Sequence, residues 1–135
     1  MTDAPVVHIV DDDEAVRLSL SFLLETAGFR VETHHSAVAF LDRSGIPTQG
    51  CIVTDVRMPE MDGLTLQQKL VERGIALPVI VMTGHGDIPI AVQALKAGAV
   101  DFLEKPFDDE LLISAVRTAL ERNQRDRGRQ SETAV

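Results

Sequence analysis

The chain has 135 residues, 44% of them apolar and 25% charged, a composition that fits one globular domain and excludes extended disorder and low complexity. Acidic residues outnumber basic ones by 21 to 13, and the formal net charge of −8 argues against binding to the phosphate backbone of nucleic acids. Trp and Tyr, which form the stacking platforms of single-strand binders, are absent from the sequence. We therefore expect no direct nucleic acid binding by this chain.

Neither a membrane segment nor a signal peptide is predicted. No apolar run reaches the roughly 18 to 20 residues needed to cross a bilayer. Residues 1–5 lack the basic and hydrophobic regions of a signal peptide, so we expect a cytoplasmic protein. The single cysteine, Cys51, lies beside Ile52 in an apolar run and has no partner for an internal disulfide, which predicts a buried core thiol.

Short β-branched runs alternate along the chain with longer segments of helical period, which is typical of βα units around a parallel sheet. In chain order, the predicted pairs of strand and helix cover residues 6–10 and 14–27, 30–34 and 36–43, 50–54 and 63–73, 78–82 and 88–97, and 100–104 and 109 to about 122. Four of the strands are mostly apolar, as expected when helices cover both faces of a sheet. The strand at 30–34 is more polar, which predicts an edge strand.

The sequence changes character after Arg122, because no apolar residue occurs from Asn123 to Thr133. We interpret residues 1–122 as one domain and residues 123–135 as a polar tail or linker. Acidic residues dilute the arginines of this segment, which favours a solvated linker over a contact with nucleic acid.

Polar residues follow four of the predicted strands at their carboxyl ends. Asp11 and Asp12 follow the first strand, Asp55 the third, Thr83 the fourth and Lys105 the fifth. In an open α/β sheet, ligands bind beyond the carboxyl ends of the strands. We therefore expect these five residues to project toward one edge of the sheet.

Taken singly, each of these residues has a structural explanation. Asp11, Asp12 or the neighbouring Asp13 would cap the helix that follows, since short acids satisfy free N–H groups there. Together, three carboxylates repel one another unless a cation lies among them, and Lys105 supplies one. Oxygen ligands of this kind suit Mg²⁺ completed by a phosphate oxygen, which predicts a phosphoryl site. A carboxylate can also attack phosphorus and form an aspartyl phosphate, but spacing alone does not identify the nucleophile.

Five sequence segments carry a resemblance to a known family. They are VDDDE at 10–14, VTDVRMPEMDG at 53–63, TGHGD at 83–87, KAGA at 96–99 and FLEKPF at 102–107. In order and spacing they resemble the receiver domains of two-component response regulators, over about residues 5 to 122. The sequence around Asp55 and the TGHGD segment are most similar to FixJ-type transcriptional regulators, in which a DNA-binding helix-turn-helix domain follows the receiver. The resemblance implies a doubly wound, flavodoxin-like or CheY-like α/β fold, with a five-stranded parallel sheet of order 2-1-3-4-5 and five helices.

The same resemblance implies a role for each acidic residue. Asp55 is the expected phosphoacceptor and also a metal ligand. Asp11 and Asp12 are expected to hold Mg²⁺, with the backbone carbonyl of Arg57 as a further ligand. In the run of three aspartates we choose the first two over Asp13, because the first acid of the family pair directly follows the strand.

Three further residues receive roles from the resemblance. Lys105 is expected to pair with the phosphoryl group, and Thr83 to hydrogen-bond one of its oxygens. Phe102 stands at the position of the family's switch aromatic. The resemblance also implies a cis peptide bond before Pro106, which the sequence permits.

Among the histidines, only His85, in the loop after Thr83, is a candidate for a chemical role, which would be to tune the lifetime of the phosphoryl group. His8 lies inside the first strand between apolar neighbours and is interpreted as a satisfied packing residue. His34 and His35 end the second strand, away from the acids.

The helix at 88–97 carries more apolar residues than the one stripe needed to cover a sheet. They are Ile88, Ile90, Ala91, Val92, Ala94, Leu95 and Ala97. Small residues at the surface would explain part of this excess. We favour a partner surface, formed with the strand at 100–104, that supports a phosphorylation-dependent homodimer.

The leading hypothesis is a phosphoacceptor switch that takes a phosphoryl group from a sensor histidine kinase onto Asp55 and controls a transcriptional output domain. Such a chain promotes only its own phosphoryl transfer and dephosphorylation. An aspartate-dependent phosphatase is an alternative, but Arg57 stands where these enzymes usually place a second acid. A flavin-binding module is a third, but acids replace the Thr/Ser/Gly-rich phosphate loop after the first strand.

Overall fold

The computed structural model describes residues 4–43, 45, 49–84 and 86–133, with side chains described as far as residue 126; His85 lies outside the described residues. Its elements are β1 (Val6–Val10), α1 (Glu14–Thr26), β2 (Arg30–His34), α2 (Ala37–Asp42), β3 (Gly50–Asp55), α3 (Gly63–Glu72), β4 (Val79–Thr83), α4 (Ile88–Lys96), β5 (Asp101–Glu104) and α5 (Asp109–Thr133). All strands are parallel and lie in the order β2-β1-β3-β4-β5. The predicted α/β fold and sheet order are confirmed, and polar β2 lies at the edge.

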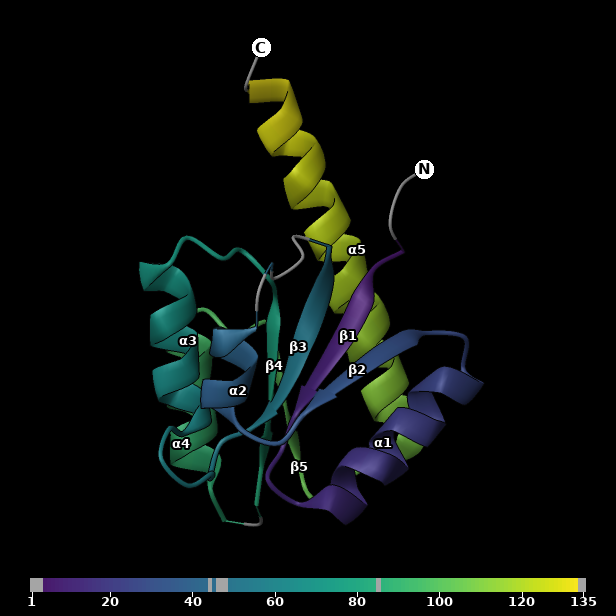
Figure 1. Ribbon diagram of the computed structural model, residues 1–135, viewed down its shortest axis with the longest axis vertical. Coiled ribbons are helices and arrows are strands. Elements are labelled where there is room, and N and C mark those ends of the chain that lie inside the picture. The colour runs from purple at the N-terminus through teal and green to yellow at the C-terminus, as the bar shows by residue number, and fades with distance from the viewer. Residues whose placement is uncertain (1–3, 44, 46–48, 85, 134–135) are drawn as a thin grey trace.

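The sheet lies between two helical layers, with α1 and α5 on one face and α2, α3 and α4 on the other (Figure 1). Successive residues of a strand point to opposite faces, so Val7 and Ile9 enter the α1 and α5 core while Val10 enters the other. Burying one such aliphatic side chain contributes about 1.5 to 3 kcal/mol. Cys51 is fully buried, as predicted, and burial raises its pKa to about 12.

Helices α1, α2 and α3 begin where short polar side chains satisfy their free N–H groups. Asp13 Oδ1 accepts from the backbone N–H of Ala15 at 2.9 Å at the start of α1. Ser36 Oγ accepts from Ala39 N at 3.0 Å and caps α2. The capping explanation offered for the aspartate run therefore applies to Asp13.

Helix α5 is longer than predicted, because it continues to Thr133 instead of ending near Arg122. Asn123 is 4% exposed, and its Oδ1 accepts a hydrogen bond of 3.1 Å from the backbone N–H of Gly50 at the start of β3. This bond ties the helix to the sheet past its last apolar residue. The segment from Gln124 to Thr133 holds three Arg and two Gln and contains no proline, which suits a helix. The domain boundary at residue 122 stays a prediction.

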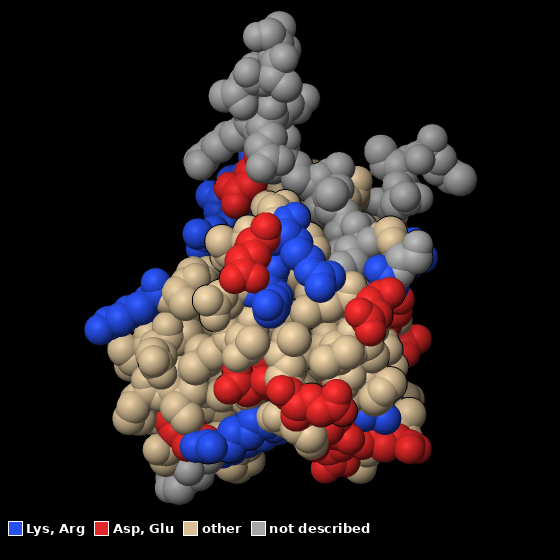
Figure 2. Space-filling view, turned by 60° about the vertical axis from the view of Figure 1, so that its left-hand side comes forward, with Lys and Arg blue, Asp and Glu red and all other residues tan. Residues whose placement is uncertain are grey.

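Helices α1, α3, α4 and α5 expose large apolar side chains, with Val71 on α3 and Leu111 on α5. On α4, Ile88, Val92 and Leu95 are exposed, whereas Ala91 and Ala94 face the core. On α1, two side chains that the sequence analysis did not single out are more exposed still, and these are Leu18 at 63% and Phe22 at 74%. Figure 2 brings the α3 and α4 side forward and shows an uncharged band between charged groups above and below it. Within the described part of the chain, no helix combines the length and apolar character needed to traverse a bilayer.

Candidate functional site

The carboxyl ends of β1, β3 and β5 bring four of the predicted site residues together. Carboxylate oxygens of Asp11, Asp12 and Asp55 all lie within 4.8 Å of one another. Lys105 Nζ lies 3.3 Å from Asp55 Oδ2 and 3.6 Å from Asp11 Oδ2. The lysine therefore stands between two carboxylates, as expected if it offsets their repulsion.

The acids differ in their exposure to water. Asp11 is only 1% exposed, the side chain of Asp55 is 15% exposed and Asp12 is open to solvent. Asp11 Oδ1 accepts a hydrogen bond of 2.9 Å from Asp13 N, and Arg17 Nη1 donates to the Asp11 carbonyl oxygen at 2.7 Å. These bonds fix Asp11 in place just beyond the end of β1.

Among the three acids, Asp11 is the one whose ionised form burial destabilises most. Burial raises the pKa of its carboxyl, and the hydrogen bond from Asp13 and the charge of Lys105 only partly oppose this rise. Its Oδ2 atom is buried and accepts no hydrogen bond from any described residue. A buried polar atom of this kind calls for a partner. A divalent cation fits this oxygen, because the three acids offer the hard ligands that Mg²⁺ takes.

The loop from β3 to α3 folds closely over Asp55. A Cβ atom at Gly63 would lie 2.7 Å from the Asp55 carbonyl oxygen, so only glycine fits the first position of α3. Glu60 adopts a φ of 69°, which is uncommon for a residue with a side chain. The turn directs Arg57 N toward Asp55 Oδ1 at 3.4 Å. The backbone of Arg57 therefore lies beside the carboxylate.

The side chain of Arg57 makes a contact that the sequence did not reveal. Its Nε and Nη2 atoms donate to the two carboxylate oxygens of Asp87 at 2.8 and 2.9 Å. This bond lowers the pKa of Asp87 and joins the β3–α3 loop to the start of α4. The two residues are 30 positions apart in sequence, and no local pattern couples them.

The remaining predicted residues lie on β4 and β5, next to the acids. Thr83 is fully buried, and its Oγ1 lies 3.5 Å from the carbonyl oxygen of Leu103, on the β5 side. Phe102 is half-buried and packs against the core on the α4 side. Lys105 N donates to the Thr83 carbonyl oxygen at 2.7 Å, and the peptide bond from Lys105 to Pro106 is cis, as predicted.

Comparison with known proteins gives a family and near relatives. The family described as response regulator receiver domain matches residues 7–117. The transcriptional regulatory protein FixJ of Azorhizobium caulinodans is 57% identical over 133 residues, which is 98% of this chain and 62% of that protein. The chain spans between 52% and 62% of the length of this and other curated relatives.

Two solved structures share the fold. The crystal structure of FixJ-N matches with a TM-score of 0.79 and 52% identity, over 90% of this chain and 96% of that one. The response regulator StyR matches with a TM-score of 0.89 and 42% identity, over 98% of this chain and 67% of that one. Sheet order, family match and sequence identity agree with the resemblance drawn from the motifs. The chain therefore belongs to the response regulator receiver domain family.

Proposed function

We propose that this chain is a phosphoacceptor switch in which Asp55 accepts a phosphoryl group from a sensor histidine kinase. The observation that carries the proposal is the position of Lys105 Nζ, within 3.3 Å of Asp55 and 3.6 Å of Asp11. This arrangement provides a carboxylate nucleophile, a neighbouring cationic side chain and a set of oxygen ligands for a metal. Positioning and charge stabilisation are the main requirements of phosphoryl transfer.

In the proposed reaction, a carboxylate oxygen of Asp55 attacks phosphorus, and the bond from phosphorus to the donor breaks with its electron pair on the leaving group. Lys105 neutralises charge on the transferred oxygens. Asp11, Asp12, Asp55 and the backbone carbonyl of Arg57 would hold Mg²⁺, which supplies positive charge beside those oxygens.

The output of the switch is proposed to run through Thr83 and Phe102. The Thr83 hydroxyl would leave its long contact with Leu103 and bind a phosphoryl oxygen. Phe102 would then turn inward from its half-buried position beside α4. Such a two-state movement changes the α4 and β5 surface, which is where we place a phosphorylation-dependent dimer.

A phosphatase acting on a separate substrate is less well supported. The position two residues after Asp55 holds Arg57, whose side chain is engaged with Asp87. No second acid is therefore available there for turnover, and we propose that the chain promotes only its own phosphorylation and dephosphorylation. A transcriptional output domain, the absence of nucleic acid binding by this chain and a cytoplasmic location also stay predictions.

Phosphorylation by acetyl phosphate tests the proposed nucleophile. With Mg²⁺ present, intact-mass spectrometry is expected to show one acid-stable, base-labile phosphoryl adduct on the parent chain and none on Asp55→Asn. Asp13→Asn is the matched control, because Asn also caps α1 and the residue adjoins the site. An adduct on Asp55→Asn equal to that of the parent would show that the nucleophile is another residue.

Light scattering tests the proposed dimer. The unmodified chain is expected to be mainly monomeric, and the chain activated with beryllofluoride to dimerise at micromolar concentrations, on the order of transient interfaces. Val92→Glu and Leu95→Glu, both at exposed positions, should prevent this. Phe22→Glu, on α1, is the control and should still dimerise. An activated parent that stays monomeric would reassign the α4 surface to another partner.

A further inference from the structure

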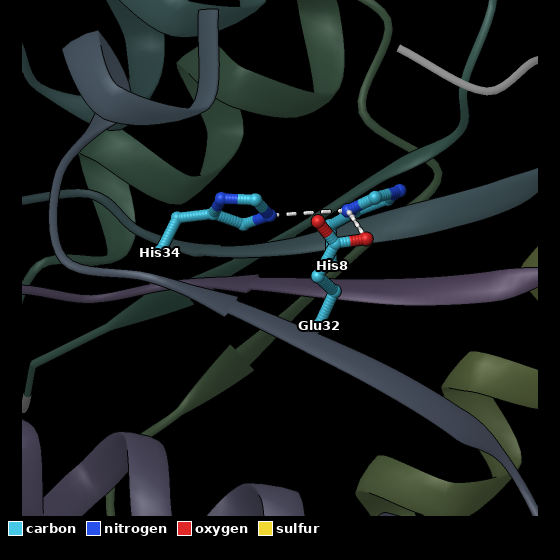
Figure 3. A group of neighbouring side chains, drawn as sticks. All are labelled: His8, Glu32 and His34. Carbon is cyan, nitrogen blue, oxygen red and sulfur yellow. Dashed lines mark hydrogen bonds and ion pairs between the residues drawn. The ribbon is translucent and has the colours of Figure 1, made fainter. Parts of the chain in front are cut away.

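A second group of metal-ligand side chains lies away from the acidic site, on the β1 and β2 strands. His8 Nδ1 forms a hydrogen bond of 3.1 Å with His34 Nε2 and lies 4.0 Å from Glu32 Oε2. One ligand atom from each of the three residues falls within 4.8 Å of the others. Figure 3 shows both rings and the carboxylate converging from the two strands.

The parallel register of the two strands creates this group. His8 pairs with Glu32, and His34 lies two residues further along β2, on the same face of the sheet. Helix α2 covers that face with Phe40, whose ring meets His8 and His34 edge-on at centroid distances of 5.2 and 4.9 Å. The two imidazoles are therefore held in place, one fully buried and the other 9% exposed.

The distances suit a borderline transition metal. Two nitrogens bonded to one tetrahedral Zn²⁺ at about 2.0 to 2.1 Å lie roughly 3.3 to 3.4 Å apart, close to the 3.1 Å of the hydrogen bond between the rings. Zn²⁺ would replace that hydrogen bond, with the ring protons on the outer nitrogens, Nε2 of His8 and Nδ1 of His34. Glu32 Oε2 needs to approach His8 by roughly 0.7 Å. The Glu32 side chain is 36% exposed, so it has room to move and leaves an open side for a water ligand.

The protonation state of the cluster favours a cation over a proton. Burial, together with the neighbouring His34, lowers the pKa of His8 to about 4 against the opposing charge of Glu32. His8 is therefore neutral near pH 7, the form in which imidazole binds metals.

We propose that His8, Glu32 and His34 form a second cation site, which takes Zn²⁺ or a similar divalent transition metal with water as the fourth ligand. Two imidazoles and one carboxylate suit zinc, whereas the all-oxygen acidic cluster suits Mg²⁺. The ion would join edge strand β2 to β1. It would also adjoin the acidic site, because the His34 carbonyl oxygen accepts a 3.2 Å hydrogen bond from Asp11 N.

Arg43 opposes this site and offers a sharp test of it. Its Nε and Nη2 atoms donate to the two Glu32 carboxylate oxygens at 2.6 and 2.9 Å. The guanidinium charge repels an incoming cation, while each carboxylate oxygen keeps a second lone pair for the metal. Removal of the guanidinium in Arg43→Gln is therefore expected to tighten zinc binding. A histidine pair that only packs would not respond in this way.

The experiment is a Zn²⁺ titration of the full, tag-free chain against a chromophoric chelator, in excess Mg²⁺ to occupy the acidic site. One equivalent of zinc is expected to bind. Glu32→Gln and His34→Gln should weaken binding roughly tenfold or more, and His35→Gln, an exposed neighbouring histidine, should not. Circular dichroism checks that each variant is folded. If His34→Gln does not fold, Glu32→Gln still tests the proposal, because the Glu32 side chain is half-exposed.

A second readout locates the ion. In ¹⁵N NMR spectra, zinc is expected to shift Nδ1 of His8 and Nε2 of His34 and to leave the ring of His35 unchanged. Absence of zinc binding, equal affinity in Glu32→Gln and the parent, or binding that is lost in Asp11→Asn but kept in Glu32→Gln would each overturn the proposal.

Discussion

The acidic cluster and the histidine cluster both draw on β1 and its neighbouring strands, yet they hold their polar groups in opposite ways. Asp11 and Asp12 come after the strand has ended, where Asp12 meets solvent and the buried Asp11 meets the charge of Lys105. His8 and His34 lie within strands under Phe40 and stay uncharged. Position relative to the strand end therefore decides whether a group keeps its charge. Charge remains where water or a counterion is near, and burial removes it elsewhere.

The largest effect is expected from removing the Phe40 ring, which covers the histidine cluster. Phe40 is fully buried, so Phe40→Ala should lower the free energy of unfolding by about 3 to 5 kcal/mol. Urea unfolding measures this. Phe22→Ala, at a side chain that is 74% exposed, should change stability by no more than about 0.5 kcal/mol. A loss below about 1 kcal/mol for Phe40→Ala would mean that the rings do not depend on this cover.

The next largest effect is expected at acid pH, where the two clusters should change the stability of the fold in opposite directions. The pKa of His8 is lowered to about 4 from an ordinary 6.5, so between these values the unfolded chain binds a proton that the folded chain does not. Stability attributable to His8 is complete above pH 6.5 and falls as pH drops toward 4, by up to about 3 kcal/mol. The raised pKa of Asp11 acts in the opposite direction.

Comparing urea unfolding of the parent and His8→Leu across this pH range isolates the histidine contribution. The variant should lose the part of the downward slope that His8 contributes and keep the part from His34, whose pKa burial also lowers, while His35→Gln should keep both. Parallel curves for the parent and His8→Leu would show that His8 is protonated in the folded chain.

Removal of the positive charge of Lys105 tests the acidic cluster alone. Lys105→Met should slow phosphorylation by acetyl phosphate roughly 100-fold, by analogy with the loss of one charge-stabilising donor. Lys105→Arg keeps a positive charge and should retain more of the rate. Quantitative mass spectrometry over time gives both rates. Zinc affinity should not change in either variant, because the ion pairs described for the Lys105 side chain are with the acidic cluster alone.

The smallest expected effect concerns the exposed acid. Asp12→Ala removes one of three neighbouring carboxylates, so the metal-free chain should gain about 0.5 kcal/mol or less, while Mg²⁺ binds more weakly. Calorimetry measures the Mg²⁺ affinity, and thermal melts measure the stability. Asp13→Asn, which keeps the α1 cap, should leave both unchanged. Mg²⁺ affinity equal to that of the parent in Asp12→Ala would remove this residue from the ligand set.

The sheet and the acidic cluster could be predicted because each depends on a local pattern. Strand runs, and acids placed directly after them, are visible in sequence, and Asp11, Asp55 and Lys105 meet as expected. The histidine cluster could not be predicted, since it depends on the register of β1 against β2 and on cover by Phe40. His8 was interpreted as a satisfied packing residue, and its Nε2 has no hydrogen-bond partner among the described residues.

Two further features were missed for a related reason. The contact from Arg57 to Asp87 joins loops 30 residues apart, and no periodic pattern reports such a pair. The length of α5 was underestimated because a polar segment has no apolar stripe to mark it. The Asn123 bond to Gly50 N, which spans 73 positions, holds the start of that segment against the sheet instead.

The hydrogen bond from Gly50 N to Asn123 also fixes the rotation of α5 about its own axis. The rest of the helix projects past the sheet in Figure 1, and each later residue points in a direction set by this rotation. From Asn123 to Thr133 the helix advances by about 15 Å, at 1.5 Å and about 100° per residue. A group placed at the far end therefore faces a direction fixed by the count of residues from Asn123. Insertion of one residue after Asp126 turns that direction by about 100°, whereas insertion of seven nearly restores it. The number of residues in this part of α5 thus determines the orientation of whatever follows the helix.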